Sequence, residues 1–400
     1  MPLTLHRRTA AWLFALTIAG IAYGSLYPFE FRWVAIPLDA ALHELHVDLR
    51  GKWSKSNILA NVMLFMPFGL FGAATLIAQR AWRRWCLLLA GGALLAFGLQ
   101  VLQLWLPARY SDFGDGVLNM LGLVLGGALA QLWVRAQAPP ALHGDELLAL
   151  PVLLMGCWVA YKWAPFVPTA DWYTIKQNLK PLLFEPRLDL LSVYGNLVCW
   201  LVFANLWRDC RLAPAWLWWV IPGVVLAQAG IAHNALALDG VIGAALALAI
   251  WPLLTRIAPR PQTAVMCLLL ALVCILGLWP FVRSESLFHW LPFYGFLSGS
   301  MFVNLLSLLF KLYLYGALVW LALRTTRSLW AALVIPVIIT TLVEIAQTQV
   351  AGRAAEITDP LLCALIWSVL LPSRQRAHVS CCDTPSQRLP SQAQMASRRL

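Results

Sequence analysis

Polar residues are rare in this chain, and the few that recur in one pattern are its first candidates for chemistry. Two sets of four share one order and one spacing, although they lie far apart in the sequence. The first set is Gln100, Gln103, Arg109 and Asp115, and the second set is Glu344, Gln347, Arg353 and Asp359. An arginine beside carboxylates can hold a charged group by charge-assisted hydrogen bonds. Polar positions that match without a gap indicate that the two segments are copies of one unit.

The first set continues into the next segment, where Asp112, Asp115 and Asn119 share one face of a predicted helix start. Carboxylates at a helix N-terminus are favoured by the helix dipole and can cap free N–H groups. Arg109 can bind one of these carboxylates through two parallel hydrogen bonds. Two interpretations stay open: an Arg–Asp clasp that joins two helices, or an outward-open pocket for a headgroup or another charged ligand. The same two apply to the second set, which consists of Glu344, Gln347, Arg353, Glu356 and Asp359.

Glu344 lies about one turn inside the end of its predicted helix, where a lone carboxylate would be costly in a membrane. Lys311 lies in the neighbouring predicted helix, nearer its middle. A direct pair of Lys311 with Glu344 would require the lysine to reach outward. A proton or ion site is one interpretation of these two residues, and a snorkelling lysine or a buried structural pair is the other.

Other chemistry finds little support in the sequence. His43, Glu44 and His46 lack the spacing that places two imidazoles on one helical turn, and residues 38–49 are expected to lie as an amphipathic segment on the membrane surface. The nine Cys include no Cys-x-x-Cys, so we expect small buried hydrophobic residues. We predict no metal site, no cofactor and no named catalytic group, since two acids and one arginine do not define a reaction.

Composition indicates what surrounds these residues. Of the 400 residues, 61% are hydrophobic and only 12% are charged, whereas a soluble domain has about a quarter charged residues. The mean hydropathy is +0.73. Apolar stretches of about 17–25 residues recur, which is the length that crosses a bilayer. The net charge of +11 resides largely in arginines of short loops, so it indicates membrane topology and not a nucleic-acid partner. The fold class is therefore all-α, a polytopic transmembrane helix bundle whose partners include membrane lipids.

About twelve transmembrane helices are predicted. They cover residues 10–28, 57–79, 85–106, 114–134, 146–164, 188–207, 214–232, 236–255, 263–281, 302–323, 328–348 and 358–372. The first follows Arg7 and Arg8 and shows no small-residue cleavage site, so we interpret it as an uncleaved helix. Arginines then recur in alternate loops, which places both termini in the cytoplasm. The polar segment after Pro372 is expected to be a disordered tail.

A unit of four helices recurs three times. Each copy ends its first helix with a Pro-Phe pair: Pro28-Phe29, Pro165-Phe166 and Pro280-Phe281. Each second helix opens near an asparagine: Asn57 and Asn61, then Asn196, then Asn304. The middle copy keeps only Gln228, His233 and Asp239 of the polar pattern. The predicted units are residues 1–137, a degenerate 138–258 and 259–373, followed by the tail at 374–400. Glycines are expected to let helices approach closely, at Gly91, Gly92, Gly122, Gly126 and Gly127.

The first unit resembles the VanZ-like family of bacterial membrane proteins. The resemblance rests on Asn57, Asn61, Pro67-Phe68-Gly69, Gln103, Arg109, Asp112, Asp115, Asn119, Gly122 and Gly126. Gln100 departs from the family, which usually has Glu there, and Glu344 restores that acid in the third unit. The third unit in turn departs at Leu314, Cys363 and Ile366, which replace the Pro, the Asn and the first Gly.

The resemblance implies a role in the cell envelope, since the founding member is associated with resistance to teicoplanin-type glycopeptides. It implies no agreed catalytic mechanism. We predict a non-enzymatic protein of the bacterial cytoplasmic membrane that binds a glycopeptide or lipid-linked headgroup at outward-facing Arg/Asp sites. Alternatives are a secondary transporter or lipid flippase, a membrane enzyme of envelope glycolipids, and a structural partner of another envelope machine. Substrate-dependent ion flux would distinguish the transporter.

Overall fold

The computed structural model describes residues 7–32, 55–107, 112–136, 149–297 and 301–371. This part of the chain is helical, and it contains three isolated β-bridges and no strand. The amphipathic segment at 38–49, Arg109 and the predicted tail lie outside the described residues.

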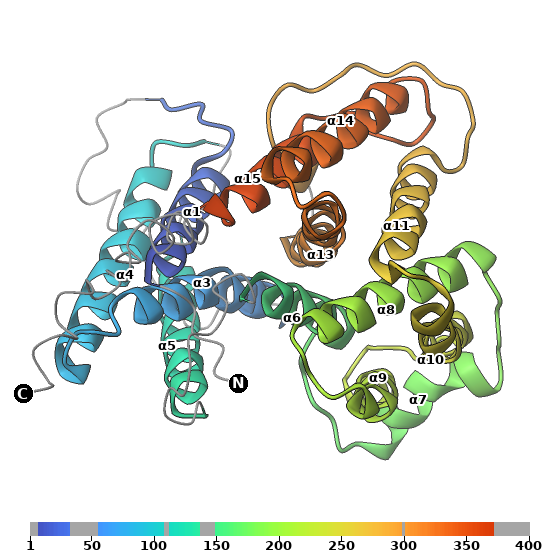
Figure 1. Ribbon diagram of the computed structural model, residues 1–400. Coiled ribbons are helices and arrows are strands. Elements are labelled where there is room, and N and C mark those ends of the chain that lie inside the picture. Colours follow the sequence, from blue (N-terminus) through green and yellow to red (C-terminus); the bar gives the residue numbers. More distant parts are fainter. Residues whose placement is uncertain (1–6, 33–54, 108–111, 137–148, 298–300, 372–400) are drawn as a thin grey trace, which may run out of the picture.

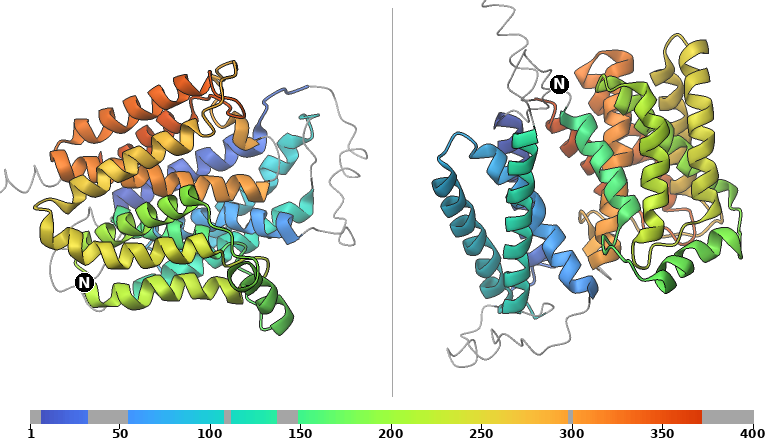
Figure 2. Two further views of the ribbon diagram at one scale, coloured as in Figure 1. Left: turned by 90° about the vertical axis from the view of Figure 1, so that its right-hand side faces the viewer. Right: turned by 90° about the horizontal axis from the view of Figure 1, so that it is seen from below.

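The first unit consists of α1 (Arg7–Leu26), α3 (Lys55–Thr75), α4 (Ala81–Gln103) and α5 (Phe113–Ala136). These helices enclose a hydrophobic cluster of their own, with Phe65, Leu88 and Leu123 among its buried members. In Figure 1 they form the blue and cyan group on one side of the molecule. Figure 2 shows that the helices of this group run roughly alongside one another.

The remaining helices share a second, larger core. They are α6 (Ala149–Trp163), α7 (Trp172–Leu183), α8 (Leu190–Asp209), α9 (Leu217–Ala227), α10 (Leu238–Ile257), α11 (Pro261–Leu278), α12 (Tyr294–Leu297), α13 (Met301–Thr326), α14 (Leu329–Gln347) and α15 (Thr358–Ser368). Buried Trp158, Trp200 and Trp320 belong to this one cluster. The predicted second and third units are thus packed together around a single core.

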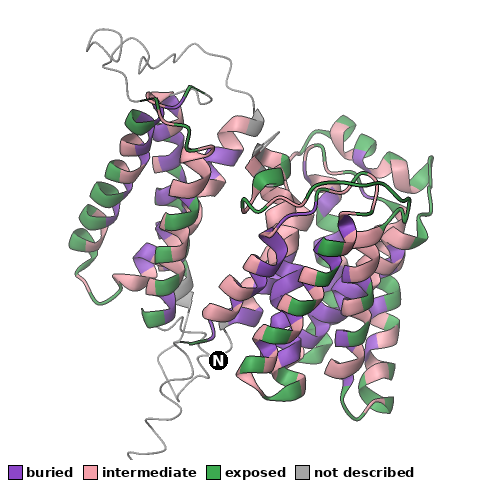
Figure 3. Cartoon of the chain, turned by 90° about the horizontal axis from the view of Figure 1, so that it is seen from above, coloured by how far each residue is buried: buried purple, intermediate pink, exposed green. Residues whose placement is uncertain are grey.

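Nine helices in the described residues are long and apolar enough to cross a membrane. They are α1, α3, α4, α5, α8, α10, α11, α13 and α14. The other three predicted stretches also contain a helix, but α6 has 15 residues and α9 and α15 have 11 each. Figure 3 shows buried residues where helices face one another and exposed residues on the outer faces, where lipid would lie. The chain is a membrane protein, and the number of twelve spans stays a prediction.

Glycine allows α3 and α5 to touch backbone to backbone. A Cβ atom at Gly122 would lie 2.1 Å from the carbonyl oxygen of Val62, and one at Gly126 would lie 2.0 Å from that of Met66. No side chain fits at such distances, so the Gly-x-x-x-Gly pair has the predicted packing role. Gly91 does not, because nothing lies within 4 Å of the position of its Cβ.

The three Pro-Phe turns have the same backbone. Each proline follows a cis peptide bond, and Phe29, Phe166 and Phe281 have φ values of 65°, 60° and 62°. In each turn the Phe N–H donates to the carbonyl three residues earlier, at 2.8–2.9 Å. Three residues later, a second N–H donates to the loop after the third helix of its own unit. These bonds are Arg32 to Trp105, Thr169 to Gly230 and Ser284 to Gln349, at 2.9, 2.9 and 3.1 Å.

Candidate functional site

Two polar clusters lie where a third helix ends and a fourth helix begins. We call the first cluster site one; it consists of Asn57, Asn61, Gln100, Gln103, Asp112, Asp115 and Asn119. We call the second cluster site three; it consists of Lys311, Tyr315, Glu344, Gln347, Glu356 and Asp359. Both lie at the end of the bundle that carries the Pro-Phe turns, because α4 and α14 end there and α5 and α15 start there.

In site one, Asp115 in the first turn of α5 faces two amides of α3. Its Oδ1 atom accepts hydrogen bonds from Nδ2 of Asn57 at 3.1 Å and from Nδ2 of Asn61 at 2.8 Å. The two asparagines are four residues apart, so one face of α3 presents both. Asn61 is buried and Asp115 is half-buried. The carboxylate therefore links α3 to α5, the two helices that also touch at Val62 and Gly122.

Two glutamines of α4 complete site one. Oε1 of Gln100 accepts a hydrogen bond from the backbone N–H of Asp112 at 3.1 Å. Nε2 of Gln103 donates to the carbonyl of Ser25 near the end of α1, at 2.9 Å. Asp112 in turn caps α5 by accepting from the N–H of Gly114 at 2.7 Å. All four helices of the first unit thus meet at this site.

Asn119 is the unusual member of site one. It lies one turn after Asp115 and is buried, with 6% of its surface exposed. Its Oδ1 atom has no hydrogen-bond partner among the described residues. A buried amide oxygen normally has a partner, so this atom marks a polar position that the rest of the first unit leaves unsatisfied.

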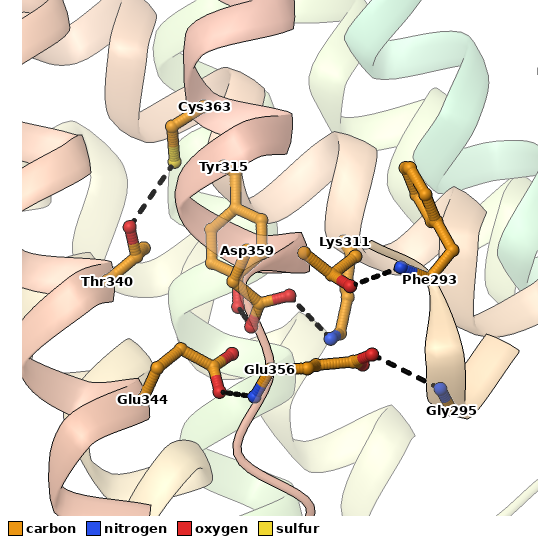
Figure 4. A network of polar contacts seen from close by, with 10 residues as sticks. Phe293, Gly295, Lys311, Tyr315, Thr340, Glu344, Glu356, Asp359 and Cys363 are labelled. Carbon is orange, nitrogen blue, oxygen red and sulfur yellow. Dashed lines mark hydrogen bonds and ion pairs between the residues drawn. The ribbon is translucent and has the colours of Figure 1, made fainter. Parts of the chain in front are cut away.

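In site three, Asp359 in the first turn of α15 faces two side chains of α13. Nζ of Lys311 lies 2.5 Å from Oδ1 of Asp359, and the hydroxyl of Tyr315 donates to Oδ2. Lys311 and Tyr315 are again four residues apart on one helix face. Figure 4 shows both reaching the carboxylate of Asp359, with Glu344 beside it. The partner of Lys311 is therefore Asp359, and not Glu344 as one interpretation of the sequence required.

Glu344 is the most buried acid of site three, with 2% of its surface exposed. Its Oε2 atom accepts a hydrogen bond from the backbone N–H of Glu356 at 2.8 Å. Oε2 of Glu356 accepts from the N–H of Gly295 at 3.1 Å. The buried carboxylates of Glu344 and Asp359 thus lie close to one lysine, Lys311, in a region of low dielectric.

The two sites match in two of their contacts. Gln100 and Glu344 occupy matching positions, and each accepts from the backbone N–H twelve residues later. Asp115 and Asp359 also match, and each is held by a pair of side chains one turn apart on the second helix. Asn304 lies in the first turn of α13, the second helix of its unit, as expected. Lys311 and Tyr315 hold Asp359 as Asn57 and Asn61 hold Asp115, and their spacing of four residues was the signal that sequence reasoning missed.

The arginines do not form the predicted clasp where the structure describes them. Nε of Arg353 donates to the carbonyl of Trp279 at 2.9 Å, which ties the loop before α15 to a Pro-Phe turn. The ion pair of Asp359 is with Lys311, because α13 brings that lysine to the start of α15. Gln347 is buried against α11, where a Cβ at Gly277 would lie 3.4 Å from its Nε2.

The middle unit has a different polar arrangement. Nζ of Lys162 donates to Oδ1 of Asn196 at 2.6 Å and lies over the ring of Trp158, 4.8 Å from its centroid. Asp239 accepts from the backbone N–H of Gly240 at 2.9 Å. The asparagine and the aspartate of the pattern are retained, but among the described residues no hydrogen bond joins them as in site one.

Comparison with known proteins gives a family match in the first unit. Residues 9–134 match the family model described as VanZ/LLP1. This segment contains all of site one, the whole of α3 and α4, and all but two residues each of α1 and α5. It does not contain site three. Neither a curated protein nor a solved structure matches the chain.

Proposed function

Residues 9–134 belong to the VanZ-like family, and from this premise we propose that the chain is an envelope protein that binds a polar headgroup at sites one and three. The headgroup would belong to a lipid-linked or glycopeptide-type molecule at the outer surface of the bacterial cytoplasmic membrane. The single observation that carries the proposal is the matching construction of the two sites at one end of the bundle. Costly polar groups held twice in the same way favour a shared task over accidental packing.

Three related four-helix units form part of the proposal. The matching Pro-Phe turns, and the matching hydrogen bond that follows each turn, support a common origin. In this proposal the first and third units carry the binding sites. The middle unit contributes to the core that holds the third unit in place, since α8 and α13 are packed in one cluster.

Complementation of a deletion strain tests the proposal. The strain would receive the wild type, Asp115→Asn with Asp359→Asn, or Arg109→Ala with Arg353→Ala. Glycopeptide susceptibility and the level of lipid-linked precursors are the readouts, and immunoblots of the membrane fraction report insertion. Arg256→Ala, on the exposed last turn of α10 at the other end of the bundle, is the matched control. We expect the wild type and the control to restore the phenotype and the site variants to fail.

If the Asp115/Asp359 double variant and the arginine double variant both restore the phenotype fully, the two sites have no part in the activity. An unchanged phenotype in the deletion strain itself would remove the link to envelope chemistry. In that case transport becomes the function to test.

A secondary transporter is the second candidate, and site three favours it. Glu344 and Asp359 are buried acids beside a lysine, an arrangement that proton-coupled transporters use. Substrate-dependent proton flux in proteoliposomes, lost on Glu344→Gln, is the expected outcome for this function. Equal flux in the wild type and in the variant would contradict it.

A further inference from the structure

A second polar cluster lies at the opposite end of the bundle, away from sites one and three. Its centre is Asp209, the last residue of α8, whose side chain is only 3% exposed. The helix rise from Lys311 to Arg324 along α13 corresponds to about 20 Å, which is the separation of this cluster from site three. No part of the proposed function uses these residues.

One buried carboxylate in this cluster faces two arginines. Nε of Arg324 lies 3.5 Å from Oδ2 of Asp209, and Nη2 of Arg208 lies 3.6 Å from Oδ1. The same carboxylate accepts a shorter hydrogen bond from Nε1 of Trp320, at 2.8 Å, and a 3.5 Å one from Nδ2 of Asn205. Asp209 neutralises only one of the two arginines, so these three charged groups carry a net charge of +1.

Tryptophan rings and amides fix the orientation of the two guanidinium groups. Arg208 lies over the ring of Trp251 at 5.6 Å, and Arg324 lies over the ring of Trp320 at 5.8 Å. Nη2 of Arg208 also donates to Asn205 at 2.8 Å and to Gln262 at 3.3 Å. A guanidinium that stacks on a ring keeps its N–H edge available. The arginine side chains are 37% and 52% exposed, so these edges reach the surface.

We propose that Arg208 and Arg324 bind the phosphate of an anionic membrane phospholipid. Two oriented guanidinium groups match the oxygens of a phosphate, and the net positive charge attracts it. Further arginines lie at or next to helix ends on the same side of the bundle, namely Arg211, Arg260 and Arg327. On α10, the helix of Trp251, the exposed side chains of Leu253 and Ile257 offer apolar surface for acyl chains. This apolar surface favours a lipid over free phosphate.

The test uses the purified full chain in detergent and follows its thermal unfolding midpoint. Dioleoyl phosphatidylglycerol is titrated in one series, dioleoyl phosphatidylcholine in a second and inorganic phosphate in a third. We expect only phosphatidylglycerol to raise the midpoint of the wild type, since a ligand that binds the folded state stabilises it. In the double variant Arg208→Gln with Arg324→Gln, the phosphatidylglycerol concentration that gives half of the maximal midpoint shift should rise at least about tenfold. The loss of charge-assisted hydrogen bonds predicts this weaker binding.

Two further variants keep the outcome interpretable. Arg83→Gln removes an exposed arginine from the start of α4, in the first unit, and should respond to phosphatidylglycerol like the wild type. The double variant Arg208→Lys with Arg324→Lys keeps the positive charge that Asp209 needs, so it should fold. It should bind phosphatidylglycerol more weakly than the wild type, but the lipid should still raise its unfolding midpoint. An equal response to phosphatidylglycerol in the double Gln variant and the wild type would overturn the proposal. An equal midpoint shift with inorganic phosphate would overturn the assignment to a lipid.

Discussion

The carboxylate of Glu344 accepts a hydrogen bond from the backbone N–H of Glu356, across the loop that joins α14 to α15. The amide of Gln100 does the same for the backbone N–H of Asp112 in the first unit. An acid and its neutral counterpart thus perform one structural task at matching positions. The acidic group of Glu344 is not needed for that bond, which leaves it available for function.

The variant Glu344→Gln should therefore fold as well as the wild type, because the amide oxygen can accept the same bond. Glu344→Ala should lower the free energy of unfolding by about 1–3 kcal/mol, since it leaves a buried N–H without its partner. Thermal unfolding in detergent micelles measures both variants. Equal stability of the Ala and Gln variants would show that the bond contributes nothing.

The contributions of Lys311 and Asp359 to the free energy of unfolding are expected to be coupled. Lys311→Met leaves a buried carboxylate without its cation and should cost about 3 kcal/mol, the lower end for buried pairs, because the lysine side chain is 23% exposed. Addition of Asp359→Asn removes the uncompensated charge and should recover at least half of that loss. A double-mutant cycle on unfolding midpoints measures the coupling. Additive effects of the two substitutions would contradict the ion pair.

Gly126→Ala should destabilise the first unit by about 1–3 kcal/mol, as overpacking does. The new Cβ atom would lie 2.0 Å from the carbonyl oxygen of Met66, and a backbone atom cannot move aside as a flexible side chain can. Gly91→Ala is the matched control, because nothing lies within 4 Å of its Cβ position. The control should be neutral or slightly stabilising, since alanine favours the helix. Comparable losses in both variants would argue against the close approach of α3 and α5.

Asp171 caps α7, which lies outside the nine long apolar helices. Its carboxylate accepts from the hydroxyl and the N–H of Thr174, at 2.6 and 2.9 Å, and these bonds lower the pKa of Asp171. A lowered pKa in the folded state means that the cap is fully charged at neutral pH and is lost only as the pH falls below the usual range of Asp, about 3.9. Asp171→Ala should increase hydrogen exchange in the first turn of α7 at pH 7, whereas Asp171→Asn should not. Unchanged exchange in the Ala variant would mean that tertiary contacts alone hold the helix.

One such contact is made by Asn178, a buried residue of α7. Its Nδ2 atom donates to the carbonyls of Ala229 and Ile231, at 3.0 and 2.7 Å. Because this amide links α7 to the loop after α9, the Asp171→Ala variant should retain the helix position even as its first turn opens. The increase in hydrogen exchange should therefore be confined to the first turn of α7.

The sequence alone determined the membrane class, the helix positions and the kinship of the first unit. Long apolar stretches can span lipid only as helices, so hydropathy is sufficient for that assignment. It also located both polar clusters, because costly residues such as Asp115, Glu344 and Asp359 stand out in an apolar chain. The role of Gly122 and Gly126 followed from their spacing on one helix face.

Only the tertiary structure decided which polar groups meet. Arg353 precedes Asp359 by a few residues, yet it reaches Trp279, while Lys311 arrives from a helix far away in the sequence. Partner choice depends on the rotation and depth at which α13 packs beside α15, and hydropathy does not encode either. The cluster of Asp209 with Arg208 and Arg324 could not be predicted from the sequence for the same reason. It joins the ends of α8 and α13, and these ends meet only because the two helices share one core.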